Sequence, residues 1–241
     1  MLTAILTARS KVACGVANKQ DQIVNIDMGD ENDDLAVAEY VDDIYKFCKL
    51  IEVPSSLVNY MNSQPDINVK MRSILIDWLI DVHRIFELMP ETLYLTIYIV
   101  DWYLSKKIVS RRELQLVGMS SMLLACKYEG SYCLWVDDLV CITDYAYPDT
   151  QILVMEKAIL EKLEWYLTVP TPYVFLVRYI KASVAPDLEM ENMVFFLAEL
   201  GLMHYPTTIL YYASMIAAAA VFATHYTLNK TPFWSETLKS R

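Results

Sequence analysis

Nine prolines divide the sequence into blocks of helical length, and none of them interrupts a block. Proline lacks an amide hydrogen and clashes inside a helix, so it is tolerated only between helices or in a first turn. Apolar residues recur at helical spacing within the blocks, and strand-like alternation is not sustained anywhere. The sequence therefore predicts an all-α fold. Its helical blocks lie at 69–88, 91–106, 111–129, 135–145, 149–165, 172–183, 188–204 and 207–228.

Composition and charge narrow the function. Only five glycines occur in 241 residues, and 55% of the residues are apolar, which supports a helical protein with a sizeable core. The net charge of −10 disfavours binding to nucleic acid, which needs clustered Lys and Arg, and to an anionic membrane. A protein partner or a basic peptide fits this charge better. No nucleotide-binding, metalloprotease or hydrolase motif is present, so we expect no enzyme, no metal and no cofactor.

One apolar stretch is long enough to raise the question of whether it spans a membrane. Residues 209–228 contain no Asp, Glu, Lys or Arg, and their length alone permits a membrane span. Four consecutive alanines occupy the middle, and Ser, Thr and His interrupt the stretch. Small residues suit a helix that other helices grip closely on all sides. We therefore predict a buried core helix here, and a membrane span is the alternative.

The N-terminal residues have a different character. Nine acids and no Lys or Arg occur between Asp21 and Asp43, and residues 1–34 lack a helical apolar stripe. This composition predicts a disordered acidic segment over residues 1–34. A helix is predicted over 35–52, with Asp33 or Asp34 as its N-terminal cap.

Four charged residues lie on apolar helical faces. Lys127 shares a face with Leu123 and Leu124, and Glu156 shares one with several aliphatic residues. The structural reading is that both reach past the core into water. The functional reading is a polar anchor that meets the backbone of a partner protein. For Arg72 and Asp101 the favoured reading is an internal salt bridge between two helices.

A short internal sequence repeat suggests two similar units. The segment "SMLLA" at 121–125 resembles "SMIAA" at 214–218, and each lies in a block rich in small residues. Two tandem helical units are therefore plausible. In this register Lys127 corresponds to Ala220, so any special role of the charge belongs to the first unit alone.

Several longer segments carry a family resemblance. These are "MRSILIDWLIDVH", "ETLYLTIYIVDWYLS", "RRELQLVGMSSMLLACKYE", "ITDYAYPDTQILVMEKAILEKLEWYLTVPTPYVFL" and "LAELGLMHY". Together, and in this order, they resemble the cyclin box of B-type mitotic cyclins such as those of plants. The resemblance implies a cyclin fold: an N-terminal helix at 35–52, a complete five-helix box at 57–168, and a second box at 169–241. We expect the second box to be truncated after about three helices.

The resemblance also implies a function. Cyclins are not enzymes but regulatory subunits that bind and activate a cyclin-dependent protein kinase, here at the G2/M transition. They reposition the kinase helix that bears the catalytic-site Glu, which orders the Lys–Glu pair needed for phosphoryl transfer. Such a protein acts in the nucleus and cytoplasm. No basic import cluster is evident, so nuclear entry would rely on the partner.

Residue roles follow from the same resemblance. It makes Lys127 and Glu156 the kinase-contacting pair and Arg72 with Asp101 an internal salt bridge. The predicted apolar kinase contact is lined by Leu124, Tyr128 and Trp165. A shallow patch that docks Arg-x-Leu substrate or inhibitor peptides is predicted from Met71, Ile74, Leu75, Trp78, Asp81 and Gln115. The alternative for this patch is ordinary core packing.

The sequence also departs from the family pattern. Gly130 stands where the family has an acid that helps to contact the kinase, and Trp102 stands where the family has a basic residue. Arg9, Val12 and Asn18 do not form the family's destruction signal. These changes, with the short second box, motivate an alternative function. The chain would then be a non-activating scaffold or competitor that binds the kinase weakly or not at all. A DNA-binding cyclin fold is a third class, disfavoured by the net charge.

Overall fold

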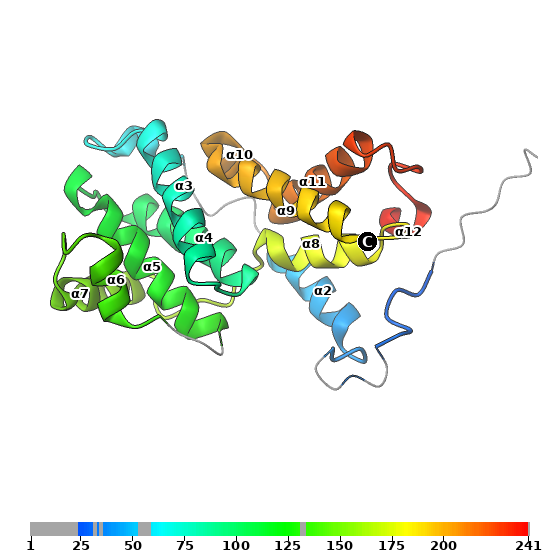
Figure 1. Cartoon of the computed structure of the whole chain (residues 1–241), viewed down its shortest axis with the longest axis horizontal. Coiled ribbons are helices and arrows are strands. Elements are labelled where there is room, and N and C mark those ends of the chain that lie inside the picture. Colours follow the sequence, from blue (N-terminus) through cyan, green and yellow to red (C-terminus); the bar gives the residue numbers. More distant parts are fainter. Residues whose placement is uncertain (1–23, 31–32, 34–35, 53–58, 131–133, 241) are drawn as a thin grey trace, which may run out of the picture.

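The computed structural model describes residues 24–30, 33, 36–52, 59–130 and 134–240, and within these ranges the regular elements are all helices. Figure 1 shows them as two groups joined side by side. The α-helices of the first group are α3 (Val69–Ile85), α4 (Pro90–Lys106), α5 (Leu114–Glu129), α6 (Val136–Ile142) and α7 (Asp149–Lys162). Those of the second are α8 (Pro172–Lys181), α9 (Leu188–Met203), α10 (Tyr205–Leu210), α11 (Ala213–Thr227) and α12 (Glu236–Lys239). The helix α2 (Val41–Ile51) precedes both, and two short 3-10 turns lie at Met61–Ser63 and Arg111–Glu113.

Each group is built around one central helix. In the first group α5 packs against α3, α4 and α7, and its residues from Leu116 to Cys126 are all buried. Gly118 permits a close approach, because a Cβ atom there would lie 2.8 Å from Leu75 Cδ1. In the second group α11 packs against α8 and α9. The two similar segments, 121–125 and 214–218, therefore lie in the central helices α5 and α11.

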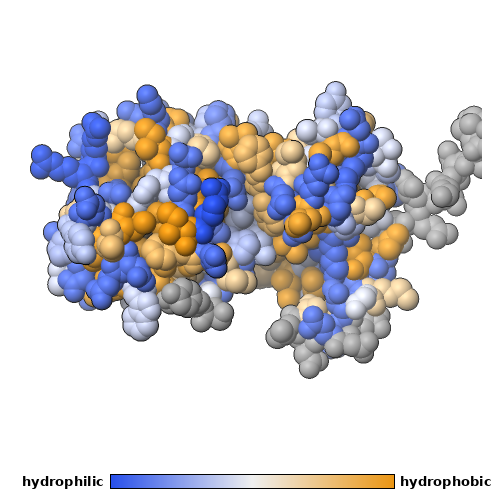
Figure 2. All heavy atoms as spheres, in the orientation of Figure 1, coloured by the Kyte–Doolittle hydropathy of each residue, from blue (hydrophilic) through white to orange (hydrophobic). Residues whose placement is uncertain are grey.

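The helix starts follow the local sequence. Asn68 caps α3 by accepting a hydrogen bond from Met71 N, and Pro90 is the first residue of α4. Ser110 and Glu113 form a reciprocal capping box ahead of α5. Figure 2 shows apolar patches among hydrophilic residues over both groups on the face in view.

The prediction of one helix over 207–228 is wrong, because two helices occupy this stretch. The short α10 begins at Tyr205 with Pro206 in its first turn, and the extended backbone of Tyr211 separates it from α11. The expectation that neighbours would grip this helix on all sides is also wrong. Packing on α8 and α9 covers one face of α11, while Met215, Phe222 and Tyr226 are exposed on another. In the described part of the chain, none of the helices has the length and apolar character needed to cross a membrane.

Helix α2 begins at Val41 rather than at residue 35, and its N-cap is Tyr40 without a side-chain hydrogen bond. Of the two predicted caps, Asp34 lies outside the described residues. The predicted helix stops short because residues 36–40 form turns, with a positive φ of 48° at Val37. The helix packs against the second group, where the ring of Tyr45 lies 5.7 Å from that of Phe175.

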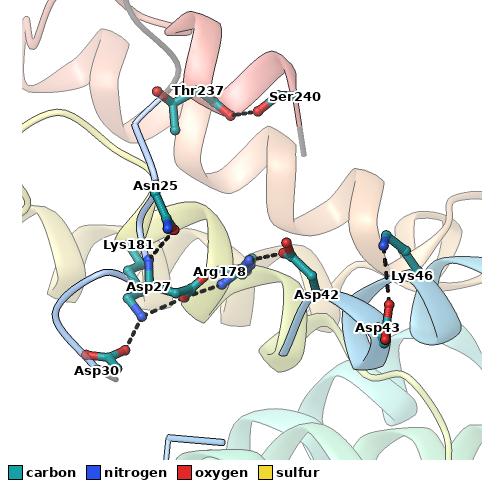
Figure 3. Close-up of polar contacts among 10 residues, drawn as sticks. All are labelled: Asn25, Asp27, Asp30, Asp42, Asp43, Lys46, Arg178, Lys181, Thr237 and Ser240. Atoms are coloured by element: carbon teal, nitrogen blue, oxygen red, sulfur yellow. Dashed lines mark hydrogen bonds and ion pairs between the residues drawn. The ribbon is translucent and has the colours of Figure 1, made fainter. Parts of the chain in front are cut away.

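The prediction of disorder is wrong for residues 24–30, which we call the acidic strap; residues 1–23 lie outside the described part of the chain. Figure 3 shows the strap beside Arg178 and Lys181, at the C-terminal end of α8. Asp27 Oδ1 accepts hydrogen bonds from Arg178 Nη1 at 2.6 Å and from Lys181 Nζ at 2.8 Å. Asp30 also pairs with Lys181, and Val24 N donates to Thr237 Oγ1 of α12 at 3.2 Å. The acids hold the strap in place because Arg178 is buried and needs carboxylate partners.

Candidate functional site: an ion pair at the α5–α7 edge

Lys127 and Glu156 converge although 29 positions separate them. Lys127 lies in the last turn of α5 and Glu156 in the middle of α7. A hydrogen bond from Ser120 Oγ to the Ile152 carbonyl, at 3.2 Å, ties the two helices together farther along. The Lys127 Nζ to Glu156 Oε1 distance is 2.6 Å. The two charged residues therefore form one ion pair.

The pair sits at a rim. The Lys127 side chain is 46% exposed, whereas the Glu156 side chain is only 10% exposed. Lysine carries three N–H donors, so the half-exposed ammonium retains donors for another group after pairing with Glu156. The carboxylate in turn has a second oxygen with acceptor capacity. The arrangement is suited to meeting carbonyl and N–H groups of another chain's backbone.

The three residues predicted to line the apolar kinase contact differ in exposure. Leu124, one turn before Lys127 on α5, is buried. Tyr128 and Trp165 are both exposed, and Trp165 adopts a positive φ of 63° just after α7. The Tyr128 hydroxyl lies 2.5 Å from Thr168 Oγ1, in the segment that leads to the second group. Thr168 was not identified from the sequence, because the helical spacing of residues within α5 cannot predict a contact with this later segment.

The residues predicted to dock peptides lie where α3 packs on α5. Ile74 is the most prominent, with 58% of its surface exposed, and Met71, Trp78 and Gln115 are half-buried. Leu75 is buried against Gly118. Asp81 is exposed and lies 3.5 Å from Arg84 on the same helix. The structure thus presents a shallow apolar surface on α3 with an acid farther along it.

Arg72 and Asp101 form a buried, two-pronged salt bridge between α3 and α4. Arg72 Nε and Nη2 each lie 2.6 Å from one Asp101 oxygen, and the side chains are 0% and 2% exposed. The Tyr60 hydroxyl donates to Asp101 Oδ1 at 2.7 Å. Burial alone would lower the pKa of Arg72, but attraction to Asp101 outweighs it and raises this pKa.

This salt bridge also joins the two helical groups. Arg72 Nη1 donates to the Leu202 carbonyl at 3.0 Å, and Nη2 donates to Thr208 Oγ1 at 3.3 Å. The guanidinium lies 5.6 Å from the centre of the Tyr205 ring. The sequence predicted the two charges but not these partners, because they lie about 130 positions away.

Family models for two consecutive domains match the chain, namely the "Cyclin, N-terminal domain" over residues 43–168 and the "Cyclin, C-terminal domain" over residues 170–240. The chain belongs to the cyclin family. Among solved structures, a viral cyclin from herpesvirus saimiri has the same fold, with a TM-score of 0.70. It is 23% identical, and the match covers 80% of this chain and 85% of the viral one. The expected cyclin fold is therefore confirmed.

Curated relatives refine the position of this cyclin within the family. "G2/mitotic-specific cyclin-2" of Antirrhinum majus is 64% identical over 99% of this chain and 54% of its own length. "Cyclin-B1-4" of Arabidopsis thaliana is 59% identical over 98% of this chain and 60% of its own length. The resemblance to B-type mitotic cyclins of plants is thereby confirmed. This cyclin spans a little over half the length of these relatives.

Gly130 and Trp102, the two departures from the family pattern that lie in the described residues, both have ordinary local structures. Gly130 ends α5, and its N–H donates to the Cys126 carbonyl at 3.0 Å with a negative φ that other residues also adopt. Trp102 is half-buried, and Lys106 Nζ lies 5.7 Å from its ring centre. Within the described residues, no cluster of three His, Cys, Asp or Glu side chains is arranged to hold a metal ion.

Proposed function

We propose that this cyclin is a regulatory subunit that binds and activates a cyclin-dependent protein kinase at the G2/M transition. The observation that carries the proposal is the Lys127–Glu156 ion pair, which is half-exposed at the rim of the α5–α7 surface. The match to both cyclin domain models and to G2/mitotic-specific relatives supports it. In this role the chain itself performs no chemistry.

The physical role of the pair is to anchor the kinase. Lys127 donates to backbone carbonyls of the kinase helix, while Glu156 keeps the ammonium in place and offers its free oxygen to a backbone N–H. Tyr128 and Trp165 supply exposed aromatic surface beside the pair. Holding that helix in one position orders the kinase's Lys–Glu pair, which raises the rate of phosphoryl transfer.

The first prediction concerns Lys127→Ala and Glu156→Ala. Each removes half of the anchor, and Lys127→Ala also leaves the Glu156 carboxylate nearly buried without its cation. We expect each variant to bind the kinase at least about tenfold more weakly, a loss of about 1.4 kcal/mol. Affinity is measured by titrating the purified kinase, and activation is measured by histone phosphorylation.

The matched control is Lys157→Ala, the neighbour of Glu156 on α7. Lys157 forms an exposed pair with Glu161 at 4.0 Å and lies away from Lys127. It should bind and activate as wild type does. Absence of kinase binding by wild type, or equal affinity of Lys127→Ala and Lys157→Ala, would defeat the proposal. Binding without activation would favour the scaffold or competitor instead.

We further propose that the exposed surface of α3 docks Arg-x-Leu peptides. Ile74 and the half-buried Met71 and Trp78 offer apolar contact for the leucine, and Asp81 lies where it attracts the basic residue. Leu75 supports the surface from below because it is buried against α5.

The second prediction is that Ile74→Ala weakens binding of such a peptide by about tenfold, because it removes the most exposed apolar contact of the patch. Fluorescence polarisation of a labelled Arg-x-Leu peptide measures this. Ile85→Ala is the control, since Ile85 is equally exposed at the far end of the same helix. Equal losses in both variants would exclude a specific docking site on α3.

Localisation is proposed from function alone. A kinase regulator of this type divides between nucleus and cytoplasm and enters the nucleus with its partner. Imaging of a tagged Lys127→Ala variant tests this, because loss of kinase binding should leave it cytoplasmic. Nuclear accumulation of the variant at the wild-type level would contradict entry with the kinase.

A further inference from the structure

The outer face of α3 changes character along its length. Helical spacing places five residues on this one side of the helix, namely Lys70, Ile74, Asp77, Trp78 and Asp81. Trp78 is half-buried, and the other four are exposed. The face therefore begins with a cation, continues with apolar side chains and ends with two carboxylates.

The starts of α3 and α5 lie at the same end of this face. Gln64, just before α3, donates to the Lys107 carbonyl at 2.7 Å and accepts from Val109 N at 3.0 Å, just before α5. Farther along both helices, Leu75 packs on Gly118. The two helices therefore run in the same sense, and the carboxylates of α3 lie at the opposite end from the first turn of α5.

The segment that enters α5 adds a second cation to this end. Arg111 belongs to the 3-10 turn that runs directly into α5, and it precedes Gly118 by about two helical turns. It therefore lies on the side of α5 that faces α3. Lys70 lies in the first turn of α3, and both residues are exposed. We call Lys70 and Arg111 the basic end of the docking patch.

The positive charge of the basic end is not used up within the chain. Among the acids whose positions the structure describes, none forms an ion pair with Lys70 or Arg111. The nearby Glu113 bonds to Ser110 Oγ at 2.7 Å in the capping box. Three further exposed cations lie in the same stretch, namely Lys106, Lys107 and Arg112. A protein with a net charge of −10 thus carries a local positive surface here.

The order of charges along the patch sets the direction of a bound peptide. In an Arg-x-Leu peptide the arginine precedes the leucine. An arginine at the two carboxylates and a leucine on Ile74 therefore direct the following residues toward the basic end. Ile74 and Lys70 are about 6 Å apart along the helix axis, which an extended peptide covers in about two residues.

We propose that the docking patch selects Arg-x-Leu peptides that carry a phosphorylated residue two or three positions after the leucine. This inference rests on the proposed docking function of α3 and specifies its substrates. A phosphate carries a charge of about −1.5 to −2, so it matches the two cations of the basic end. The Arg111 guanidinium has the geometry to bind two phosphate oxygens at once. A carboxylate carries a single charge and gains less.

The test compares four labelled peptides that differ only at the second residue after the leucine, which is serine, phosphoserine, aspartate or lysine. Fluorescence polarisation with the full chain measures each affinity. We expect phosphoserine to bind about three- to tenfold more tightly than serine, aspartate to gain less, and lysine to bind most weakly. Raising the salt concentration to about 0.5 M should reduce this preference, because salt screens exposed charges.

Variants assign the preference to named residues. Arg111→Gln and Lys70→Gln should each bring the ratio of phosphoserine to serine affinity closer to one. Lys157→Gln is the matched control, because it removes the charge of an exposed lysine on α7 and should keep the wild-type ratio. Ile74→Ala should weaken the serine and phosphoserine peptides alike, because it removes apolar contact rather than charge.

The outcomes separate this inference from the docking function beneath it. Equal affinity for serine and phosphoserine peptides, with both weakened in Ile74→Ala, would overturn the phosphate preference and leave docking supported. Aspartate binding as tightly as phosphoserine would show that the basic end recognises any negative charge, which contradicts the phosphate assignment. A preference that survives in both Arg111→Gln and Lys70→Gln would place the phosphate elsewhere. Absence of Ile74-dependent binding by every peptide would overturn docking on α3 and this inference with it.

Discussion

At the scale of single residues, the buried salt bridge of Arg72 and Asp101 was predictable and its wider network was not. A charge on an apolar helical face needs an opposite charge, so the sequence paired Arg72 with Asp101. The same reasoning singled out Lys127 and Glu156, which the structure brings together. Periodicity cannot reveal that Tyr60 and Tyr205 complete the Arg72 cluster, because tertiary packing alone brings these distant residues there.

The third prediction is that Arg72→Met lowers the free energy of unfolding by about 3–5 kcal/mol, because it leaves the buried Asp101 carboxylate without a cation. Urea denaturation measures this. Arg84→Met on the same helix is the control, since its pair with Asp81 is exposed and such pairs contribute about 0–1 kcal/mol. Replacing both partners, as Arg72→Met with Asp101→Leu, should restore part of the loss. Similar effects of Arg72→Met and Arg84→Met would contradict the buried-pair account.

At the scale of elements, the helices followed from proline placement and apolar spacing, and the errors lie where distant contacts decide. The acidic strap lacks an apolar stripe, so composition alone indicated disorder. Its carboxylates are fixed by Arg178 and Lys181, about 150 positions later. The break between α10 and α11 was missed because apolar residues continue through Tyr211 and Tyr212.

The fourth prediction concerns the strap. Burial alone would raise the pKa of Asp27, but its bonds to Arg178 and Lys181 lower it below the usual 3.8. The stabilisation is therefore present above about pH 4 and is lost as the pH falls through the lowered value. At pH 7, Asp27→Asn should destabilise the protein by about 1.5–3 kcal/mol and expose the strap to proteolysis.

Figure 3 also contains the control for the strap, the pair of Asp43 and Lys46, which lies 3.3 Å apart at the surface. Asp43→Asn should leave the melting temperature and the rate of proteolysis nearly unchanged. The difference between the two variants should shrink as the pH falls through the lowered pKa of Asp27, because Asp27 itself then takes up a proton. A difference that persists unchanged below that pKa would show that charge is not what holds the strap.

At the scale of the whole molecule, helix α2 belongs physically to the second group. Tyr45 of α2 packs on Phe175, and its hydroxyl lies 3.3 Å from that of Tyr179. Glu52, just after α2, accepts hydrogen bonds from Ser214 N and Oγ at the start of α11. Although α2 precedes the first group in the sequence, its packing makes it a brace for the second group.

The fifth prediction is that α2 and α8 open together. Tyr45→Ala removes a buried ring, so amide hydrogen exchange should accelerate at least about tenfold in both helices. Exchange in α5 should stay slow, because its core does not include Tyr45. Tyr40→Ala, at an exposed ring one turn earlier, is the control. Faster exchange in α2 alone would show that the two helices are not one cooperative unit.

Helix α2 precedes the first group in the sequence but packs on the second, and this has a consequence for synthesis of the chain. A ribosome releases about 5–20 residues per second. The 134 positions between Tyr45 and Tyr179 therefore correspond to roughly 7–27 seconds of elongation. Tyr45 therefore leaves the exit tunnel well before its ring partners have been synthesised. Helix α2 emerges before the helices on which it packs, so it is buried late, and the nascent chain offers chaperones an apolar face until translation is well advanced.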